Sequence, residues 1–480
     1  MFKSRRTEPL FVSAEALFEL EQELAEPLFM GVPIGSTLGG LFGLELLCGQ
    51  GKWDLKSVNL DRLRYWYHYF RGLRLTPKQE ISDTGRIIIT WSNEKPYNRD
   101  LILPLLKGLG ASRCLIIGKT SSMESQLPIG TEFLLWENLP SIDLKTWRKN
   151  YSLCKPIWHG KLREWIRRQG ITQEVFPRLV DTMLVQSQKV MVSANLLNQI
   201  QPSVVVVEHD RHIDQAPLVL TCKFLGIPTM TMIHGVISSS YGYVPLLADL
   251  AFCWGERHRQ QMIEMGTPPE RLVITGCQRL TPNLTMNSAV ARRKVGLPPE
   301  KPLVLLATNP IYSEYRKKLV NTFCEGLTAC KDISAVVRLH PSERLDFYAK
   351  ERAMFPSVQF QNNDEWTLDE ALAASDVIFC HDSGFGNDAL VKGKPVIVMD
   401  VLPVPLGNGK ELVEQAGCPY IRNSVELAKV LHLALSDSSF RQEMSDRTRS
   451  YLGRFCAAYG QDAAENITNI IMNVANQTII

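Results

Sequence analysis

The chain of 480 residues lacks most features of secreted, membrane-spanning or nucleic-acid-binding proteins. Its formal net charge is only +3, from 53 basic and 50 acidic side chains, so charge gives no reason to expect a nucleic-acid partner. Its 11 cysteines are widely spaced and include no Cys-x-x-Cys pair, which argues against a structural zinc site and a disulfide scaffold. We therefore expect a cytoplasmic protein with no metal site.

A long uninterrupted apolar run is also missing. The nearest approach is residues 27–49, PLFMGVPIGSTLGGLFGLELLCG, which is rich in glycine and interrupted by Pro33 and Glu45. A membrane-spanning helix needs about 20 predominantly apolar residues. We expect this stretch to form a buried helix pair or a surface that rests on a membrane, so peripheral association with the inner membrane is an alternative to a freely cytoplasmic protein.

The chain contains short apolar runs that alternate with helical segments. In the first half, strands are predicted at 86–92, 113–118, 132–136, 203–210, 228–235, 250–255 and 271–276. In the second half they are predicted at 302–309, 334–341, 357–361, 376–380 and 394–400. Continuous apolar strands separated by helices are typical of a parallel sheet covered on both faces. The predicted fold class is α/β, with two Rossmann-like domains.

The same pattern predicts the domain limits. An N-terminal helical segment covers 1–80, with an aromatic helix near 60–73, and two Rossmann-like domains cover 81–282 and 283–425. C-terminal helices occupy 426–480. A stretch at 280–300 that is rich in proline, asparagine and charge predicts the linker. Neither domain has a Gly-x-Gly-x-x-Gly sequence after its first strand, which disfavours a dehydrogenase.

Polar residues gather where the predicted strands end. In the first half these are Glu208, Asp210 and His234. In the second half they are Asn309, Arg338, His340, Pro341, His381, Ser383 and Gly384. Loops are polar in any protein, so each group taken singly also fits an ordinary loop. Their recurrence at successive strand ends, where ligands bind in this architecture, makes all of them candidate site residues.

The segment 377–400, VIFCHDSGFGNDALVKGKPVIVMD, carries the clearest signal. Ser383 and Gly384 precede a helix whose free N–H groups can bind a phosphate, and Asp388 within that helix can accept hydrogen bonds from a ribose diol. Ordinary capping by Asp382 or Ser383 explains the same turn and is compatible with binding. His340, held by the turn at Pro341, is expected to contact a donor phosphate.

Three residues of the first half are candidates for a general base. Glu208 follows four valines, so burial should raise its pKa toward neutrality. Asp210 stands beside Arg211 and is expected to form an ion pair with it. His234 suits either a base or a cationic phosphate ligand, but not both. We rank Glu208 and Asp210 above His234.

One family resemblance rests on an ordered set of segments. These are SVVVVEHD, GIPTMTMIHG, ADLAFCWGE, PPERLVITGC, RLHPSE and SDVIFCHDSGFGNDALVKGKPVIVMD. Together they resemble the GT-B glycosyltransferases of bacterial surface and capsular polysaccharide synthesis, including polysialyltransferases and CDP-glycerol glycerophosphotransferases. The last segment also resembles its counterpart in UDP-N-acetylglucosamine 2-epimerases. The resemblance covers roughly residues 86 to 420.

The resemblance implies two Rossmann-like domains that face each other across a cleft, with a nucleotide sugar on the second and a glycan or glycolipid acceptor on the first. His340 and Pro341 match the His-Pro donor motif, and Ser383 and Gly384 match the phosphate-binding turn. His234 matches the His-Gly loop that faces the cleft. No cofactor is implied, because the nucleotide sugar is a substrate, and a polysaccharide-export complex is a further expected partner.

Departures from these families keep other functions open. The epimerases carry paired glutamates after Asp-Ser-Gly, whereas Asp388 and Ala389 stand here. The glycerophosphotransferases usually have an Asp-Tyr-Ser-Ser turn, which this chain lacks. We expect transfer of a sugar to a hydroxyl group. An epimerase or hydrolase of nucleotide sugars, or a catalytically degenerate GT-B scaffold, stays open, as do the nucleotide, the sugar and the linkage.

Overall fold

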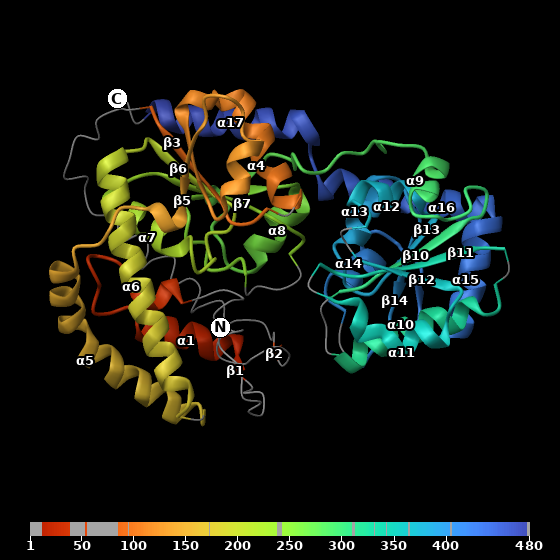
Figure 1. Ribbon diagram of the computed structural model, residues 1–480, viewed down its shortest axis with the longest axis horizontal. Coiled ribbons are helices and arrows are strands. Elements are labelled where there is room, and N and C mark those ends of the chain that lie inside the picture. Colours follow the sequence, from red (N-terminus) through yellow and green to blue (C-terminus); the bar gives the residue numbers. More distant parts are fainter. Residues whose placement is uncertain are drawn as a thin grey trace. The chain divides into compact units, whose positions relative to one another are not determined.

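A computed structural model describes residues 12–38, 53–54, 85–94, 96–171, 173–237, 242–309, 313–330, 332–341, 343–362, 365–403 and 406–477. Contacts divide the chain into two compact units, shown in Figure 1. Unit 1 is Met1–Arg279 together with Gly460–Ile480, and unit 2 is Leu280–Tyr459.

Unit 1 is built on a parallel sheet with the strand order β5-β4-β3-β6-β7-β8-β9. The strands are β3 (Ile87–Trp91), β4 (Cys114–Gly118), β5 (Glu132–Leu135), β6 (Val204–Val207), β7 (Thr229–Met232), β8 (Leu250–Cys253) and β9 (Leu272–Ile274). The four strands at the centre, β4, β3, β6 and β7, are buried along their whole length. Continuous burial is expected of parallel strands that are covered on both faces.

The helices of unit 1 are α1 (Ala14–Glu23), α4 (Pro96–Leu109), α5 (Leu144–Arg168), α6 (Val175–Ile200), α7 (Ala216–Leu225), α8 (Glu256–Glu264) and α17 (Gly460–Gln477). Because the chain runs outward from β3 to β4 but in the other direction from β6 to β7, right-handed crossovers place α4 and α7 on opposite faces of the sheet. The last helix, α17, returns to unit 1 and packs along α4 (Figure 1). Its buried residues include a row at every fourth position, Ala463, Ile467, Ile471 and Ala475.

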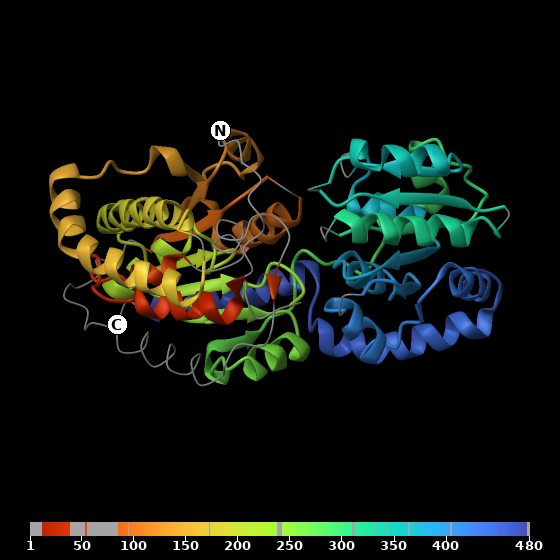
Figure 2. The same cartoon turned by 90° about the horizontal axis from the view of Figure 1, so that it is seen from below.

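The N-terminal segment packs against α5, as Figure 2 shows for α1. Two indole N–H groups of α5 donate to backbone oxygens of the N-terminal segment. Trp165 donates to Ala16 O at 3.0 Å, and Trp158 donates to Pro27 O at 3.2 Å. The buried helix pair predicted for 27–49 is wrong over residues 27–38, which form a turn and a short 3₁₀ helix, Ile34–Thr37. Residues 39–49 and the helix predicted near 60–73 lie outside the described residues.

The short strands β1 (Val12–Ser13) and β2 (Trp53–Asp54) pair in parallel. These two strands lie within the segment 1–80 that was predicted to be helical, and they do not fit that prediction. Among the helices of the described residues, none is both long and apolar enough to span a bilayer.

Unit 2 contains a second parallel sheet, in the order β12-β11-β10-β13-β14-β15. Its strands are β10 (Leu303–Ala307), β11 (Ser334–Arg338), β12 (Val358–Gln361), β13 (Val377–Cys380), β14 (Val396–Met399) and β15 (Tyr420–Ile421). Its helices are α9 (Ser288–Lys294), α10 (Ser313–Leu327), α11 (Ala349–Met354), α12 (Leu368–Ala374), α13 (Phe385–Val391), α14 (Asn408–Glu414), α15 (Ser424–Ser436) and α16 (Ser438–Phe455). The predicted α/β class with two Rossmann-like domains is confirmed.

The stretch 280–300, predicted to be a linker without regular structure, contains helix α9. Asn287 caps its first turn by accepting the N–H of Ala289 at 2.8 Å. Arg292 fixes the helix to unit 2, because its buried guanidinium donates to Ala374 O at 2.8 Å and to the Asp376 carboxylate at 2.5 Å. Arg292, one of the charged residues on which the linker prediction rested, is therefore a buried residue that holds α9 in place.

Candidate functional site

Both sheets have a point where the order of the strands reverses, and in each unit polar residues follow the two strands on either side of it. The pairs are β3 and β6 in unit 1 and β10 and β13 in unit 2. At such a point the loops run in opposite directions, so they leave a crevice at the carboxyl ends of the strands in which ligands bind. Ser92 and Glu208 follow the first pair, and Thr308 and His381 follow the second.

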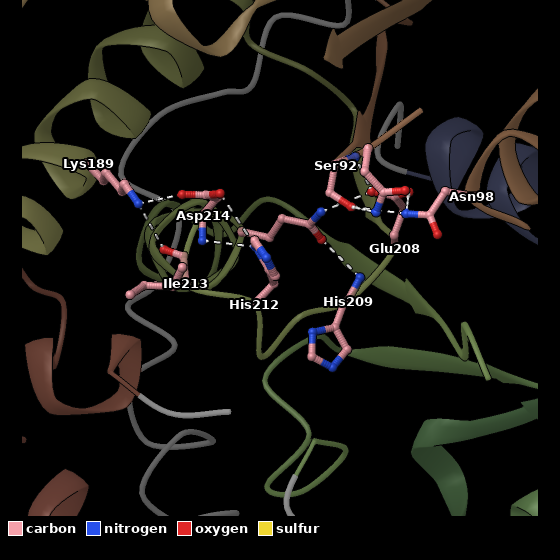
Figure 3. Close-up of polar contacts among 10 residues, drawn as sticks. Ser92, Asn98, Lys189, Glu208, His209, His212, Ile213 and Asp214 are labelled. Atoms are coloured by element: carbon pink, nitrogen blue, oxygen red, sulfur yellow. Dashed lines mark hydrogen bonds and ion pairs between the residues drawn. The ribbon is translucent and has the colours of Figure 1, made fainter. Parts of the chain in front are cut away.

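In unit 1, the carboxylate of Glu208 joins the two loops at the reversal (Figure 3). It accepts the backbone N–H of Ser92 and the Asn98 amide, each at 2.5 Å, and the Gln215 amide at 3.2 Å. Burial raises the pKa of Glu208 from its ordinary 4.5 to about 7, although these donors act in the opposite direction. Glu208 is only 1% exposed, so it positions the loops and does not face a ligand.

Asp210 and Arg211 do not form the predicted ion pair. Asp210 accepts the backbone N–H groups of Leu247 at 2.6 Å and Ala248 at 2.9 Å, and burial raises its pKa. The Arg211 guanidinium instead makes a two-fold contact with the Glu21 carboxylate of α1, at 2.6 and 3.1 Å. The prediction was wrong because adjacent residues at a strand end point to different neighbours, here to a loop and to a distant helix.

His234 belongs to an aromatic cluster with His209 and Tyr243. Its ring lies edge-to-face on His209, with centroids 4.5 Å apart, and is stacked on Tyr243 at 5.5 Å. Burial lowers the pKa of His234 to about 4, so the imidazole is neutral at pH 7. Its side chain is half-buried, whereas Glu208 and Asp210 are enclosed. Of the three candidate bases, His234 is therefore the most accessible.

In unit 2, Glu343 holds together the ends of β10 and β11. Its carboxylate accepts the Thr308 hydroxyl, the backbone N–H of His340 at 3.0 Å and the Tyr348 hydroxyl at 3.2 Å. It also pairs with Arg316 at 3.1 Å. The sequence prediction missed this residue. The sequence feature that could have identified it is its position three residues after His340, from which its carboxylate can accept the backbone N–H of His340.

A pocket of about 440 Å³ opens beside this arrangement. It is lined by His340, Pro341, Glu343, Arg344, Leu345, Asp346 and Asn362. Its volume lies within the range of small-molecule sites, about 300–1,000 Å³. The pocket brings together His340 and Pro341, as the sequence predicted for a binding site, and adds Arg344 and Asn362, which sequence analysis did not select.

The Asp-Ser-Gly turn is held to the start of α14. The Asp382 carboxylate accepts the backbone N–H groups of Gly407 at 2.9 Å and Gly409 at 2.7 Å. Gly409 is required there, because a Cβ atom would lie 2.2 Å from the carbonyl oxygen of His381. Ser383 accepts the N–H of Phe385 at 3.3 Å, and both Ser383 and Gly384 are partly exposed at the start of α13.

Four other predicted binding residues of unit 2 are buried. Arg338 donates to Trp366 O at 2.9 Å, and a ring nitrogen of His381 contacts Met399 O at 2.9 Å. Both side chains therefore make contacts within the fold, and their binding roles stay predictions. Asp388 is buried on α13. Asn309 is buried at the end of β10, and its Oδ1 has no hydrogen-bond partner among the described residues.

Known structures give the fold its wider context. No protein-family model and no curated protein matches the chain. It is similar to the UDP co-structure of S. aureus MnaA, with 15% identity and a TM-score of 0.53 over 82% of this chain and 97% of that one. The UDP-GlcNAc 2-epimerase of Methanocaldococcus jannaschii is 14% identical, with a TM-score of 0.51 over 81% and 99%. The glycotransferase of kitacinnamycin is 14% identical, with a TM-score of 0.52 over 81% and 98%.

The fold is GT-B. Each solved structure is matched over nearly its whole length, and the match extends over both Rossmann-like units of this chain. At 14–15% identity the similarity establishes the fold alone and gives no residue a function. The roles of individual side chains therefore rest on the geometry within each unit.

Proposed function

We propose that this chain is a glycosyltransferase that moves a sugar from a nucleotide sugar to a hydroxyl of a surface glycan or glycolipid. The observation that carries the proposal is the unit 2 pocket at the ends of β11 and β12, which is lined by His340, Arg344 and Asn362. It has the size and the polar lining that a nucleotide needs. The similarity of 82% of this chain to a UDP co-structure supports this choice of ligand class.

Unit 2 is proposed to hold the donor. His340 and Arg344 can donate hydrogen bonds to phosphate oxygens. The partly exposed Ser383–Gly384 turn follows β13, which is separated from β11 by one strand, β10. Such groups can offset the negative charge that develops on a leaving nucleotide without a metal ion. We therefore expect turnover to persist in EDTA.

Unit 1 is proposed to hold the acceptor, with His234 as the general base. A neutral imidazole can take a proton from a hydroxyl, and His234 is neutral at pH 7 because burial lowers its pKa. Its Nδ1 has no hydrogen-bond partner within the described part of the chain. Glu208 is assigned a positioning role, because its oxygens already accept hydrogen bonds from Ser92, Asn98 and Gln215.

Epimerisation of a nucleotide sugar is the second candidate. The similarity to a UDP-GlcNAc 2-epimerase over 81% of this chain supports it as well as it supports transfer. The two reactions differ in what they require. Transfer needs an acceptor hydroxyl, whereas epimerisation changes the donor by itself.

The reaction is tested by incubating the protein with UDP-N-acetylglucosamine or UDP-glucose, with and without a short oligosaccharide acceptor, and following the sugars by NMR. We expect release of nucleotide and a new glycosidic signal only when acceptor is present. A new sugar epimer without acceptor would replace our proposal with the epimerase. Absence of turnover, together with absence of binding to CMP-, CDP-, UDP- and GDP-sugars, would favour a scaffold.

A further inference from the structure

Helix α5 concentrates positive charge on one surface of unit 1. Its 25 residues include eight Lys or Arg and one acidic residue, Glu164, whereas the whole chain has a net charge of only +3. The charges of the two arginines in its last turn are offset by ion pairs. Arg167 pairs with Glu164, and Arg168 pairs with Glu19 and Glu23 of α1. The earlier turns carry the excess charge.

Lys145, Arg148, Lys149 and Lys155 are exposed and make no ion pair with a described residue. Lys145 and Lys149 lie opposite the buried stripe of the helix, whereas Arg148 and Lys155 lie on one side of it. The stripe includes Trp147, Tyr151, Cys154 and Trp158 at spacings of three and four. That stripe packs against α6 and α1, so α5 is the outer helix of this layer, as Figure 1 shows. The exposed cations of α5 can therefore contact another surface.

Two apolar side chains continue the row of Lys145 and Lys149, because Leu153 and Ile157 follow at intervals of four residues. Leu153 is 68% exposed and Ile157 is 48% exposed. Leu28, another exposed leucine, is held to α5 through its backbone, because its carbonyl oxygen accepts the thiol of Cys154 at 3.7 Å. A row of two lysines and two large apolar side chains forms a surface that fits both the headgroups and the outer acyl region of an anionic bilayer.

We propose that the outer face of α5 binds the surface of a membrane that contains anionic lipid. The cations would contact the headgroups, and Leu153 and Ile157 would enter the boundary between headgroups and acyl chains. A soluble polyanion would use the positive charges alone and would gain nothing from the exposed leucine and isoleucine. The proposal concerns where the protein binds and does not depend on which reaction it catalyses.

The test is flotation of the full chain with vesicles that contain phosphatidylglycerol, in parallel with vesicles of phosphatidylcholine alone. We expect binding to the anionic vesicles only, and weaker binding at high salt because the charges are screened. Lys145→Gln/Lys149→Gln should weaken binding about 25-fold, since each cation near an anionic surface contributes about fivefold. Leu153→Asn/Ile157→Asn, which keeps every charge, should weaken it at least roughly tenfold.

The matched control is Arg447→Gln/Arg449→Gln on α16 of unit 2, which removes the same charge from exposed side chains and should leave binding unchanged. Equal losses in the control and the lysine variant would overturn the assignment to α5. Failure of the wild-type protein to float with anionic vesicles would refute membrane binding outright. If Leu153→Asn/Ile157→Asn binds vesicles and heparin as well as the wild type does, the partner of this face is a soluble polyanion and not a bilayer.

Discussion

Replacing Arg211 by leucine should lower the free energy of unfolding by about 3–5 kcal/mol. The side chains of Arg211 and Glu21 are 0% and 2% exposed, and two contacts join them. Removing the guanidinium leaves the Glu21 carboxyl buried without its partner, and desolvation already raises the pKa of that group. The measurement is the urea-unfolding midpoint of the wild type and the variant at pH 7.

Two further variants separate a lost ion pair from lost packing. Glu21→Leu/Arg211→Leu removes both charges and should recover much of the stability, because no buried charge remains unpaired. Arg447→Leu breaks an exposed pair with Glu443 and should change stability by less than about 1 kcal/mol. A double variant as unstable as Arg211→Leu would show that the guanidinium acts through its packing and not through its charge.

The Glu208→Gln variant should change how stability depends on pH. Folding raises the pKa of Glu208 from 4.5 to about 7, so the folded state favours its protonated form. Its stabilising contribution is fully present below pH 4.5 and is lost as the pH rises through about 7. Relative to Glu208→Gln, the wild type should therefore lose about 3 kcal/mol of unfolding free energy between pH 4.5 and pH 8.

The unfolding free energies of both proteins, measured by urea titration at several pH values, give this difference directly. Glu124→Gln is the control, because Glu124 is exposed and its replacement should leave the pH profile of the wild type unchanged. A stability difference between wild type and Glu208→Gln that stays constant over this pH range would mean that Glu208 is ionised throughout and is not desolvated as described.

Local sequence patterns were enough to predict most of the fold. Runs such as the four valines of β6 are buried on both faces and can only be central strands, and their alternation with helices fixes a parallel sheet. The pattern could not predict α9, because its short run of charged residues has no apolar period and its anchor, Arg292, is buried by contacts with residues far along the chain. Likewise, the packing of α17 on α4 depends on contacts that no local pattern encodes.

The candidate site was predictable in position but not in the role of each side chain. His340 and Pro341 line a pocket, as their place at a strand end suggested. His381 stands at an equivalent place, yet its ring turns back to Met399 O. Whether a residue at a strand end faces a ligand or the interior depends on the loop that packs over it. For His381 that loop precedes α14 and is held by Asp382.

The central claim, that unit 2 binds a nucleotide, is tested most directly by the thermal stability of the protein with CMP, CDP, UDP and GDP. A ligand whose free concentration is 100 times its Kd should stabilise the folded state by about 2.7 kcal/mol. We expect at least one nucleotide to raise the Tm of the wild type, and we expect this rise to be lost in His340→Ala and Asp382→Ala. Asp437→Ala is the matched control, because its carboxylate also accepts two backbone N–H groups, from Ser439 and Phe440, and should keep the rise. If no nucleotide raises the Tm of the wild type, or if His340→Ala responds as the wild type does, the claim is contradicted.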